Sequence, residues 1–471
     1  MEKKYIKLAK NTAIFTIGSF TTKALSFLIV PLYTYVLATE EYGRIDLFFT
    51  AGSLLASLLT LQIHQAMMRF LLGKETKDEI ALSNSMAVFA VEVVISLLFL
   101  PVYILAFKNT ELGILFFLNL LFSSFNIVFS DYLLVVEKSV LYALKGIIVT
   151  IVLLSSNVVA LVFLKLGVRG YIYANILSQF IGSVFLLSTK LYRGKIRFRF
   201  VDIDMLQQML KYCIPLIPNS LMWWIMSSGD KFVIYFFLGD SANGLYSLAL
   251  KVPTIISMMY SFFIQAWVIS AIEENNSQEK KQFYENIYRI TTGMLVSVVA
   301  IITLFVRPLF TTVMGAEYKS AWMFVPLLSL ATAISSQTTF FAVFYTISKK
   351  TKKVFYTTLI GTVVNIVTNI ALVRVLGLQG IAIGTCVGYT VVLVIRMKDS
   401  RELFEIDLDI GRMMLGALAL LVQIPVTIIG NSITGGIVGL LCCAIIVAMY
   451  RKEIMTLFRQ ISMKLQTMRK R

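Results

Sequence analysis

The segment "SSGDKFVIYFFLGDSANGLYSLALKV", residues 227–252, shows how this chain is built. One apolar run opens with Asp230 and Lys231 and ends in a short glycine turn, and the next run contains Lys251. Two apolar runs joined by such a turn are typical of paired membrane helices, because about 20 apolar residues in a helix cross a bilayer. Charges inside such runs are costly and usually face a cavity or a partner, so these three residues are candidates for function.

The whole chain repeats this pattern. It has 471 residues, of which only 15% are charged, and a mean hydropathy of +0.81. The first apolar run, from Asn11 to Val36, is too long for a cleaved signal peptide, and we interpret it as a retained helix. We therefore predict an all-α polytopic membrane protein with about 14 transmembrane helices, near 12–36, 46–68, 83–107, 113–136, 143–164, 170–189, 212–238, 245–270, 287–309, 321–347, 354–375, 379–396, 412–429 and 434–450.

Basic residues orient these spans. With the N-terminus in the cytoplasm, 33 of the 43 Lys and Arg residues fall in cytoplasmic segments, six in outer loops and four within spans. This asymmetry predicts a multi-pass protein of the plasma (inner) membrane with both termini cytoplasmic. The net charge of +17 then faces anionic membrane lipid, so no nucleic-acid partner is needed to explain it. Residues 451–471 form a basic amphipathic pattern that predicts a helix lying on the inner surface.

A weak internal repeat divides the chain. The segment "YVLATEEYGRIDLFF" (35–49) matches "FFLGDSANGLYSLAL" (236–250), and "LGVRG" (166–170) matches "LGLQG" (376–380), at offsets of 201 and 210 residues. Two such matches at similar offsets predict two six-helix lobes of the same topology. The expected domains are an N-lobe at 1–189, a basic cytoplasmic linker at 190–211, a C-lobe at 212–396, helices 13 and 14 at 397–450, and the tail at 451–471.

The second lobe begins with a recognisable sequence. The segment 212–252 resembles the start of the second lobe in Wzx-type oligosaccharide-lipid flippases, which belong to the superfamily of multidrug, oligosaccharidyl-lipid and polysaccharide exporters. The start of the chain is similar as well, with Pro31 before the first turn and Tyr42-Gly43 within it. The residues that carry the likeness in the second lobe are Pro215, Pro218, Asp230, Lys231, Gly239, Gly244, Leu245, Tyr246, Ser247 and Ala249.

This resemblance implies a V-shaped exporter fold and a specific cargo. The cargo would be an undecaprenyl-pyrophosphate-linked oligosaccharide repeat unit, flipped from the inner to the outer leaflet for capsule, O-antigen or exopolysaccharide synthesis. A polysaccharide polymerase and chain-length machinery would be further partners. A lipid II flippase and a multidrug cation antiporter of the same superfamily remain alternatives. A membrane polymerase or glycosyltransferase is disfavoured, because no outer loop is large enough to fold into a catalytic domain.

Charged residues within the spans are the candidate cavity residues. Lys23 and Glu92 lie near the middle of the first and third spans, and either a cavity role or a structural pair would explain them. Asp230 lies about 12 Å from the outer end of its helix, and Lys251 enters the next helix to a similar depth. We therefore expect an Asp230–Lys251 bridge, with Lys231 left for another contact.

Polar residues near the inner ends of spans form a second group. His64, Gln65 and Arg69 lie together in "LQIHQAMMRF" (61–70), although Arg69 could equally reach the inner headgroups. Asp131 and Lys145 are expected to be solvated at the inner interface. The run "SSQTT" (335–339) and the pair Asn365 and Asn369 would line a wet lumen or join helices.

A lysine in the cavity suits an anionic cargo. Lys23, Lys231 and Lys251 outnumber Glu92 and Asp230, whereas a multidrug cation exporter would need acids there. We expect Lys23 and Lys251 to bind the pyrophosphate, with no catalytic residue and no cofactor. The four cysteines show no zinc spacing, and no metal site is expected. No Walker A motif is present, so energy would come from an ion gradient or from the cargo gradient.

Overall fold

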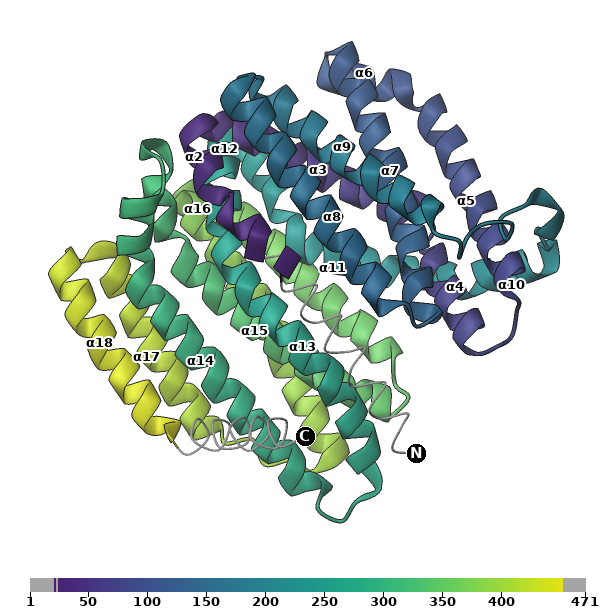
Figure 1. The fold of residues 1–471 in the computed structure, drawn as a ribbon. Coiled ribbons are helices and arrows are strands. Elements are labelled where there is room, and N and C mark those ends of the chain that lie inside the picture. The colour runs from purple at the N-terminus through teal and green to yellow at the C-terminus, as the bar shows by residue number, and fades with distance from the viewer. Residues whose placement is uncertain (1–20, 23, 452–471) are drawn as a thin grey trace, which may run out of the picture. The chain divides into compact units, whose positions relative to one another are not determined.

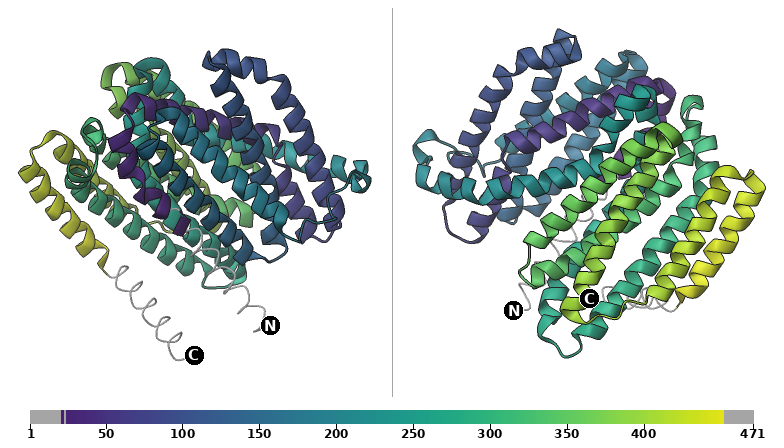
Figure 2. Two further views of the ribbon diagram at one scale, coloured as in Figure 1. Left: turned by 45° about the horizontal axis from the view of Figure 1, so that its top comes forward. Right: turned by 180° about the vertical axis from the view of Figure 1, so that it is seen from behind.

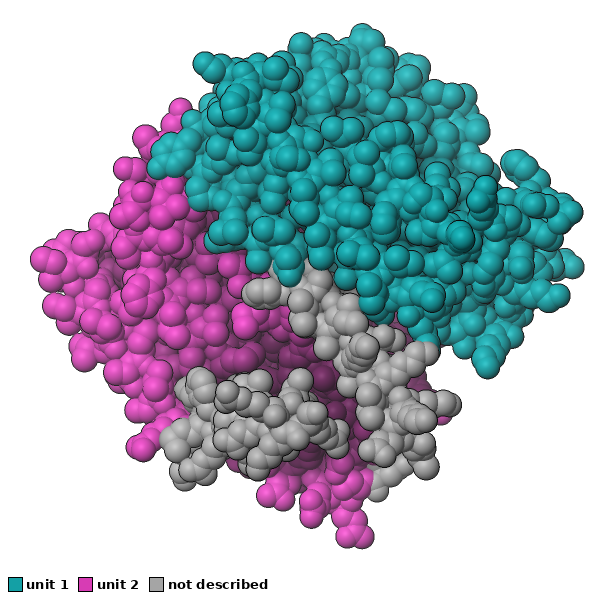
Figure 3. Space-filling model, in the orientation of Figure 1, with its two compact units in different colours: residues 1–224 teal, residues 225–471 magenta. Residues whose placement is uncertain are grey.

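The computed structural model describes residues 21–451 apart from residue 23. In this part of the chain, helices joined by turns and loops make up the regular secondary structure. The chain divides into two compact units, Met1–Trp224 and Ile225–Arg471 (Figure 3). The predicted surface helix at 451–471 lies almost wholly outside the described residues, as does Lys23.

Unit 1 holds the helices of the first half of the chain (Figure 1). The apolar helix Ala24–Val36, whose last part is α2 (Val30–Val36), precedes a sharp turn. The helices that follow it are α3 (Thr39–Leu59), α4 (Ile63–Leu72), α5 (Asp78–Leu98), α6 (Leu100–Phe107), α7 (Thr110–Val135), α8 (Ser139–Asn157), the π-helix η1 (Val158–Phe163), α9 (Gly167–Ser188), the 3-10 helix η2 (Phe198–Phe200), α10 (Ile203–Cys213) and the 3-10 helix η3 (Ile214–Leu216).

Helix α11 (Ile217–Ser228) contains the boundary between the units. The helices that follow in unit 2 are α12 (Asp230–Ala249), α13 (Lys251–Glu273), η4 (Glu274–Asn276), α14 (Lys280–Val313), η5 (Ala316–Met323), α15 (Val325–Ile347), α16 (Lys352–Phe404), α17 (Ile410–Ile429) and α18 (Ser432–Met449). The last two pack on each other and on α14, at one edge of unit 2 (Figures 1 and 2).

The helices account for each of the predicted spans, the first of which is described only in part. Within the described residues, ten helices are long and apolar enough to cross a membrane, or eleven if α3 and α4, bent by 50°, count as one span. The remaining spans arise where short helices join end to end, as α11 does with the first arm of α12, or where one long helix folds back on itself, as α16 does.

Helix α16 is a hairpin of two spans that reverses at Gly377, whose φ of +55° is a left-handed conformation that favours glycine. A side chain at Gly380 would meet Leu372, one at Gly384 would meet Asn369, and one at Gly388 would meet Asn365. As the glycine position rises from 380 to 388, the position of the residue it contacts falls from 372 to 365, which is the pattern of two antiparallel helices. The three glycines, four residues apart, let the two arms pack closely, as small residues do between membrane helices.

In both pairs of repeated turns, the helical backbone is interrupted at equivalent positions. Helical geometry is interrupted at Ala38 (φ −68°, ψ 158°) and at the equivalent Gly239 (φ +85°, ψ −178°). The second pair agrees more closely, because Gly167 and Gly377 have φ of +54° and +55°. These local matches support the repeat that the sequence predicts.

The basic segment 190–211 is docked on the rest of unit 1. Lys195 Nζ lies 2.6 Å from Asp78 Oδ2, which also accepts a hydrogen bond from the Tyr132 hydroxyl. Asn84 bonds to both the carbonyl and the amide of Asp202, at 3.1 and 3.0 Å. Burial disfavours the charged form of Lys195, but its bonds to Asp78 and Tyr132 outweigh this and raise its pKa.

Candidate functional site

Asp230 is a buried acid in unit 2, with only 4% of its surface exposed. Its Oδ2 accepts hydrogen bonds from the Tyr246 hydroxyl at 2.9 Å and the Thr385 hydroxyl at 2.7 Å. Its Oδ1 accepts one from Asn369 Nδ2 at 2.6 Å. Three donors from two hairpins therefore compensate the carboxylate, as buried charges require.

Two hairpins bring these residues together. The turn at Gly239 folds α12 back, so that Tyr246 in its second arm returns to the depth of Asp230 in its first arm. In α16, the turn at Gly377 places Asn369 in one arm beside Thr385 in the other. Asn365, one turn from Asn369, donates to Thr385 at 3.5 Å. Asn365 and Asn369 thus join helices, which was one of the two predicted roles.

The Asp230 cluster can hold a charge or a proton without a basic partner. In the described residues no group of three or more His, Cys, Asp or Glu side chains could hold a metal ion. A hard cation prefers oxygen ligands, whereas Asn369, Tyr246 and Thr385 all present donors to the carboxylate. The observed arrangement is therefore one in which the protein itself satisfies the carboxylate.

The predicted Asp230–Lys251 bridge is wrong. Lys251 is half-buried, and no ion pair joins it to Asp230, both of which the structure describes. The reason is the helical period, because Tyr246 and Lys251 are five residues apart and therefore about 140° apart around the helix axis. Since Tyr246 faces Asp230, Lys251 points elsewhere. Lys231, next to Asp230, is also half-buried.

Glu92 is a second buried acid, in α5 of unit 1. It is 2% exposed, and neither of its carboxylate oxygens accepts a hydrogen bond from the residues that the structure describes. Its predicted partner Lys23 lies outside those residues, so this pairing stays a prediction. The burial of Glu92 agrees with its predicted place in the middle of a span.

The predicted group of His64, Gln65 and Arg69 lies where α3 and α4 meet at a bend of 50°. Leu61 and Gln62 both adopt positive φ there, which is uncommon for residues other than glycine. Gln65 donates to Gln62 at 2.7 Å, and Nδ1 of His64 is buried without a partner among the described residues. Arg69, half-exposed, pairs with Glu75 at 2.6 Å and so turns away from its predicted neighbours.

Asp131 and Lys145 are not simply solvated, as was expected. Both are half-buried and line a polar pocket of about 380 Å³ between α7, α8 and α9. Lys145 Nζ donates to Ser130 Oγ at 2.9 Å. The expectation failed because it judged each residue by its distance from the end of a span, not by the neighbouring helices.

Arg396, the last residue of the predicted span 379–396, is one of the 33 basic residues assigned to cytoplasmic segments, but it is completely buried in unit 2. Its guanidinium donates to the carbonyls of Thr338 and Val354 and to the hydroxyls of Thr357 and Thr358. These contacts tie the end of α16 to its own first arm and to α15. A count of basic residues gives no signal for this role, because it treats all residues near a span's end alike.

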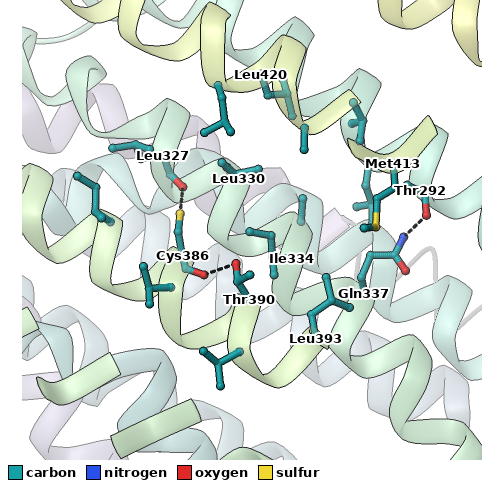
Figure 4. Close-up of a pocket in the computed structure, with 18 of the residues that line it drawn as sticks. Thr292, Leu327, Leu330, Ile334, Gln337, Cys386, Thr390, Leu393, Met413 and Leu420 are labelled. Carbon is teal, nitrogen blue, oxygen red and sulfur yellow. Dashed lines mark hydrogen bonds between the residues drawn. The ribbon is translucent and has the colours of Figure 1, made fainter. Parts of the chain in front are cut away.

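An apolar cavity of about 540 Å³ lies in unit 2 between α14, α15, α16 and α17 (Figure 4). Leucine, isoleucine and valine side chains dominate its wall, with Leu327, Leu330 and Leu420 among them. Polar groups occur at its edge, where Gln337 of the "SSQTT" run donates to Thr292 at 3.0 Å (Figure 4). The cavity suits a long hydrocarbon chain better than a hydrated ion.

The comparisons with known proteins give the family. Residues 8–269 match the family described as "Polysaccharide biosynthesis protein", which is more than half of the chain. This chain belongs to the polysaccharide biosynthesis protein family. A comparison with curated protein sequences finds no significant match.

Solved structures that resemble this family member are transporters. Lipid II flippase MurJ, in an inward closed conformation, aligns with a TM-score of 0.70 at 14% identity, over 94% of this chain and 100% of that one. A multidrug resistance MATE family transporter of the MOP superfamily, facing inward, aligns with a TM-score of 0.66 at 18% identity, over 81% and 94%. A MOP superfamily transporter from Pyrococcus furiosus gives 0.61 at 17% identity, over 84% and 96%.

These matches confirm the predicted fold class and the resemblance to the exporter superfamily. The polysaccharide biosynthesis protein is thus an all-helical membrane protein with a transporter fold.

Proposed function

We propose that this protein flips undecaprenyl-pyrophosphate-linked oligosaccharide repeat units from the inner to the outer leaflet of the plasma membrane. The observation that carries this proposal is the match to the polysaccharide biosynthesis family in a chain with a transporter fold. In polysaccharide biosynthesis, a membrane-embedded transporter would most directly carry a lipid-linked intermediate across the bilayer. The product would feed capsule, O-antigen or another exopolysaccharide.

The apolar cavity in unit 2 supports a lipid-linked cargo. Its wall of aliphatic side chains would hold part of the polyprenyl chain, since burial of apolar surface is favourable and non-directional. The hydrogen-bonded Gln337–Thr292 pair at its edge would be the point where the apolar wall of the cavity gives way to polar side chains. A wholly polar cargo would gain little from such a wall.

The pyrophosphate would be bound by lysines. Lys251 and Lys231 are half-buried in unit 2, and Lys23 is the corresponding candidate in the first span. An ammonium group is a compact point charge that suits a phosphate oxygen. Because Asp230 is already satisfied by three donors, it does not compete with the cargo for Lys251. Glu92, His64, Gln65 and Arg69 remain proposed cavity residues of the first lobe.

Transport would proceed by alternating access, without a catalytic step or a cofactor. The lobes 1–189 and 212–396, joined by the basic segment 190–211, would open the cavity to each side in turn. Both termini would be cytoplasmic, with anionic lipid beside the inner basic loops. A polymerase and chain-length machinery would use the cargo at the outer face.

A lipid II flippase is the second candidate. It is favoured by the alignment with lipid II flippase MurJ, which covers the whole of that chain. A multidrug cation antiporter is less favoured, because the candidate cavity lysines Lys23, Lys231 and Lys251 outnumber the acids Glu92 and Asp230.

Deletion of the gene separates these candidates. We expect surface polysaccharide to be lost and lipid-linked repeat units to accumulate, while cell-wall synthesis from lipid II continues. Normal surface polysaccharide, in a strain with no redundant flippase, would contradict the proposal. Accumulation of lipid II alone would favour the second candidate.

A further inference from the structure

Unit 1 contains a polar pocket of its own. It occupies about 380 Å³ between α7, α8 and α9, and Asn126, Ser130, Asp131, Tyr142, Lys145 and Gln179 are among the residues that line it. It lies near the turn that joins α7 to α8, because Asp131 is four residues before the end of α7 and Lys145 is six after the start of α8. In the proposed topology this is the cytoplasmic end, where cargo would be loaded.

Asn126 is held rigidly at the pocket. It is 5% exposed, and its Nδ2 donates to the carbonyls of Phe122 and Gln179, at 2.7 and 2.8 Å, and to Ser183 Oγ at 3.0 Å. Its Oδ1 is buried and accepts no hydrogen bond from the residues that the structure describes. An acceptor that is fixed in place and unpaired is costly unless something donates to it.

Asp131 and Lys145 bring opposite charges to the same pocket. Their charges interact, yet they form no ion pair with each other in the described structure. Among the described residues, Lys145 Nζ donates only to Ser130 Oγ, and none of them donates a hydrogen bond to the carboxylate of Asp131. The pocket therefore presents a cationic donor, an anionic acceptor and a neutral acceptor.

Gly182 of α9 lets that helix pack closely against α7 and α8 beside the pocket. A side chain there would lie 2.7 Å from Val149, 2.9 Å from Asn126 Oδ1 and 3.2 Å from Lys145 Cε. Any residue other than glycine would have to displace these groups. The pocket thus depends on a close approach that the sequence allows at this one helical position.

The mixture of groups selects a class of ligand. A phosphate would be attracted by Lys145 but repelled by Asp131, and a cation would experience the reverse. A sugar hydroxyl can donate to Asp131 or Asn126 and accept from Lys145, because each hydroxyl is both donor and acceptor. The phenol ring of Tyr142 adds a flat apolar surface beside these polar groups.

We infer that the Asn126–Asp131–Lys145 pocket of unit 1 binds hydroxyl groups of a sugar residue in the cargo. This inference rests on the proposed function, and it assigns recognition of the saccharide to unit 1. Unit 1 would then select the sugar, while the apolar cavity in unit 2 would hold the lipid.

The test compares two lipids on full-length protein in lipid nanodiscs. One probe is undecaprenyl pyrophosphate without a sugar, and the other is the lipid-linked oligosaccharide extracted from cells that lack the gene. Native mass spectrometry would measure the binding of both by wild type, Asp131→Asn and Lys145→Ala. Asp131→Asn is nearly isosteric, which limits effects on folding. Asp204→Asn and Lys138→Ala, at exposed positions of unit 1, are matched controls.

We expect each pocket variant to weaken binding of the sugar-bearing lipid about tenfold, the scale of one lost hydrogen bond to a charged group. Binding of the sugar-free lipid should not change, and the control variants should bind both lipids as wild type does. Equal losses for both lipids, or no loss for either, would overturn the inference while leaving the proposed function intact. Failure of the wild type to bind the sugar-bearing lipid would instead overturn the proposed function, and the inference with it.

Discussion

The hydroxyl of Tyr246 donates a hydrogen bond to Asp230 Oδ2 at 2.9 Å, across the turn at Gly239. Asp230 also accepts bonds from Asn369 and Thr385, which lie in opposite arms of the α16 hairpin. One carboxylate therefore joins four helical segments of unit 2. This makes Asp230 a structural centre of the unit, independent of any role in transport.

Replacement of Asp230 should destabilise the protein. Asp230→Ala removes three hydrogen bonds, each worth about 0.6 kcal/mol between membrane helices, so the loss should be about 2 kcal/mol. Tyr246→Phe removes one of them and should cost about 0.6 kcal/mol. Unfolding of the purified protein in detergent would measure both, with exposed Asp204→Ala as control. An Asp230→Ala protein as stable as that control would contradict the role of the cluster.

Asp230 and Lys251 should act independently. Because no ion pair joins them, the effects of Asp230→Asn and Lys251→Ala on stability should add within about 0.5 kcal/mol in the double variant. The measurement is a double-mutant cycle on unfolding. A coupling energy well above that limit would restore the bridge that the sequence predicted.

Close packing in the α16 hairpin gives a third prediction. Gly384→Ala would place a methyl group against Asn369, which holds Asp230, so the variant should unfold at a lower temperature than wild type. Gly436→Ala is the matched control, because a side chain at Gly436 of α18 would meet nothing within 4 Å. Alanine there should be neutral or stabilising by up to about 1 kcal/mol. Equal stability of the two variants would argue against the hairpin packing.

The orientation can be tested by labelling. Ser241 and Gln278 are both exposed and lie near opposite ends of the helical stretch that runs through α13. In a variant with its four cysteines replaced, Ser241→Cys should react with an impermeant maleimide in intact cells. Gln278→Cys should react only after the cells are opened. The reverse pattern would invert the topology, and labelling of both sites in intact cells would refute the span between them.

The sequence predicted the spans well, because hydropathy reports burial in lipid directly and glycines such as Gly239 and Gly377 mark the reversals. Glu92 lies in the interior of α5, as predicted, whereas Asp230 is the first residue of α12 and follows the break after α11. The partner of Asp230 was wrong, since matching depth along two helices ignores rotation around their axes. Tyr246 and Lys251 are five residues apart on the returning arm, and only Tyr246 faces Asp230.

Residues that depend on a third helix were harder to predict. Arg396 and Lys145 lie near the ends of spans, where basic side chains usually reach water, and nothing local distinguishes them from Lys138. Their burial follows from neighbours far away in sequence, such as Thr338 for Arg396 and Ser130 for Lys145. Long-range contacts of this kind leave no periodic signal in a single sequence.

Movement of the cargo across a bilayer is the most direct test of the central claim. The purified protein would be placed in liposomes with lipid-linked oligosaccharide that carries a fluorophore on its sugar, and an impermeant quencher would be added outside, with ion gradients imposed in either direction. We predict that wild-type protein exposes the inner-leaflet label to the quencher and that Lys251→Ala does not. Wild-type protein that left the inner-leaflet label protected under every gradient, as in protein-free liposomes, would contradict the account.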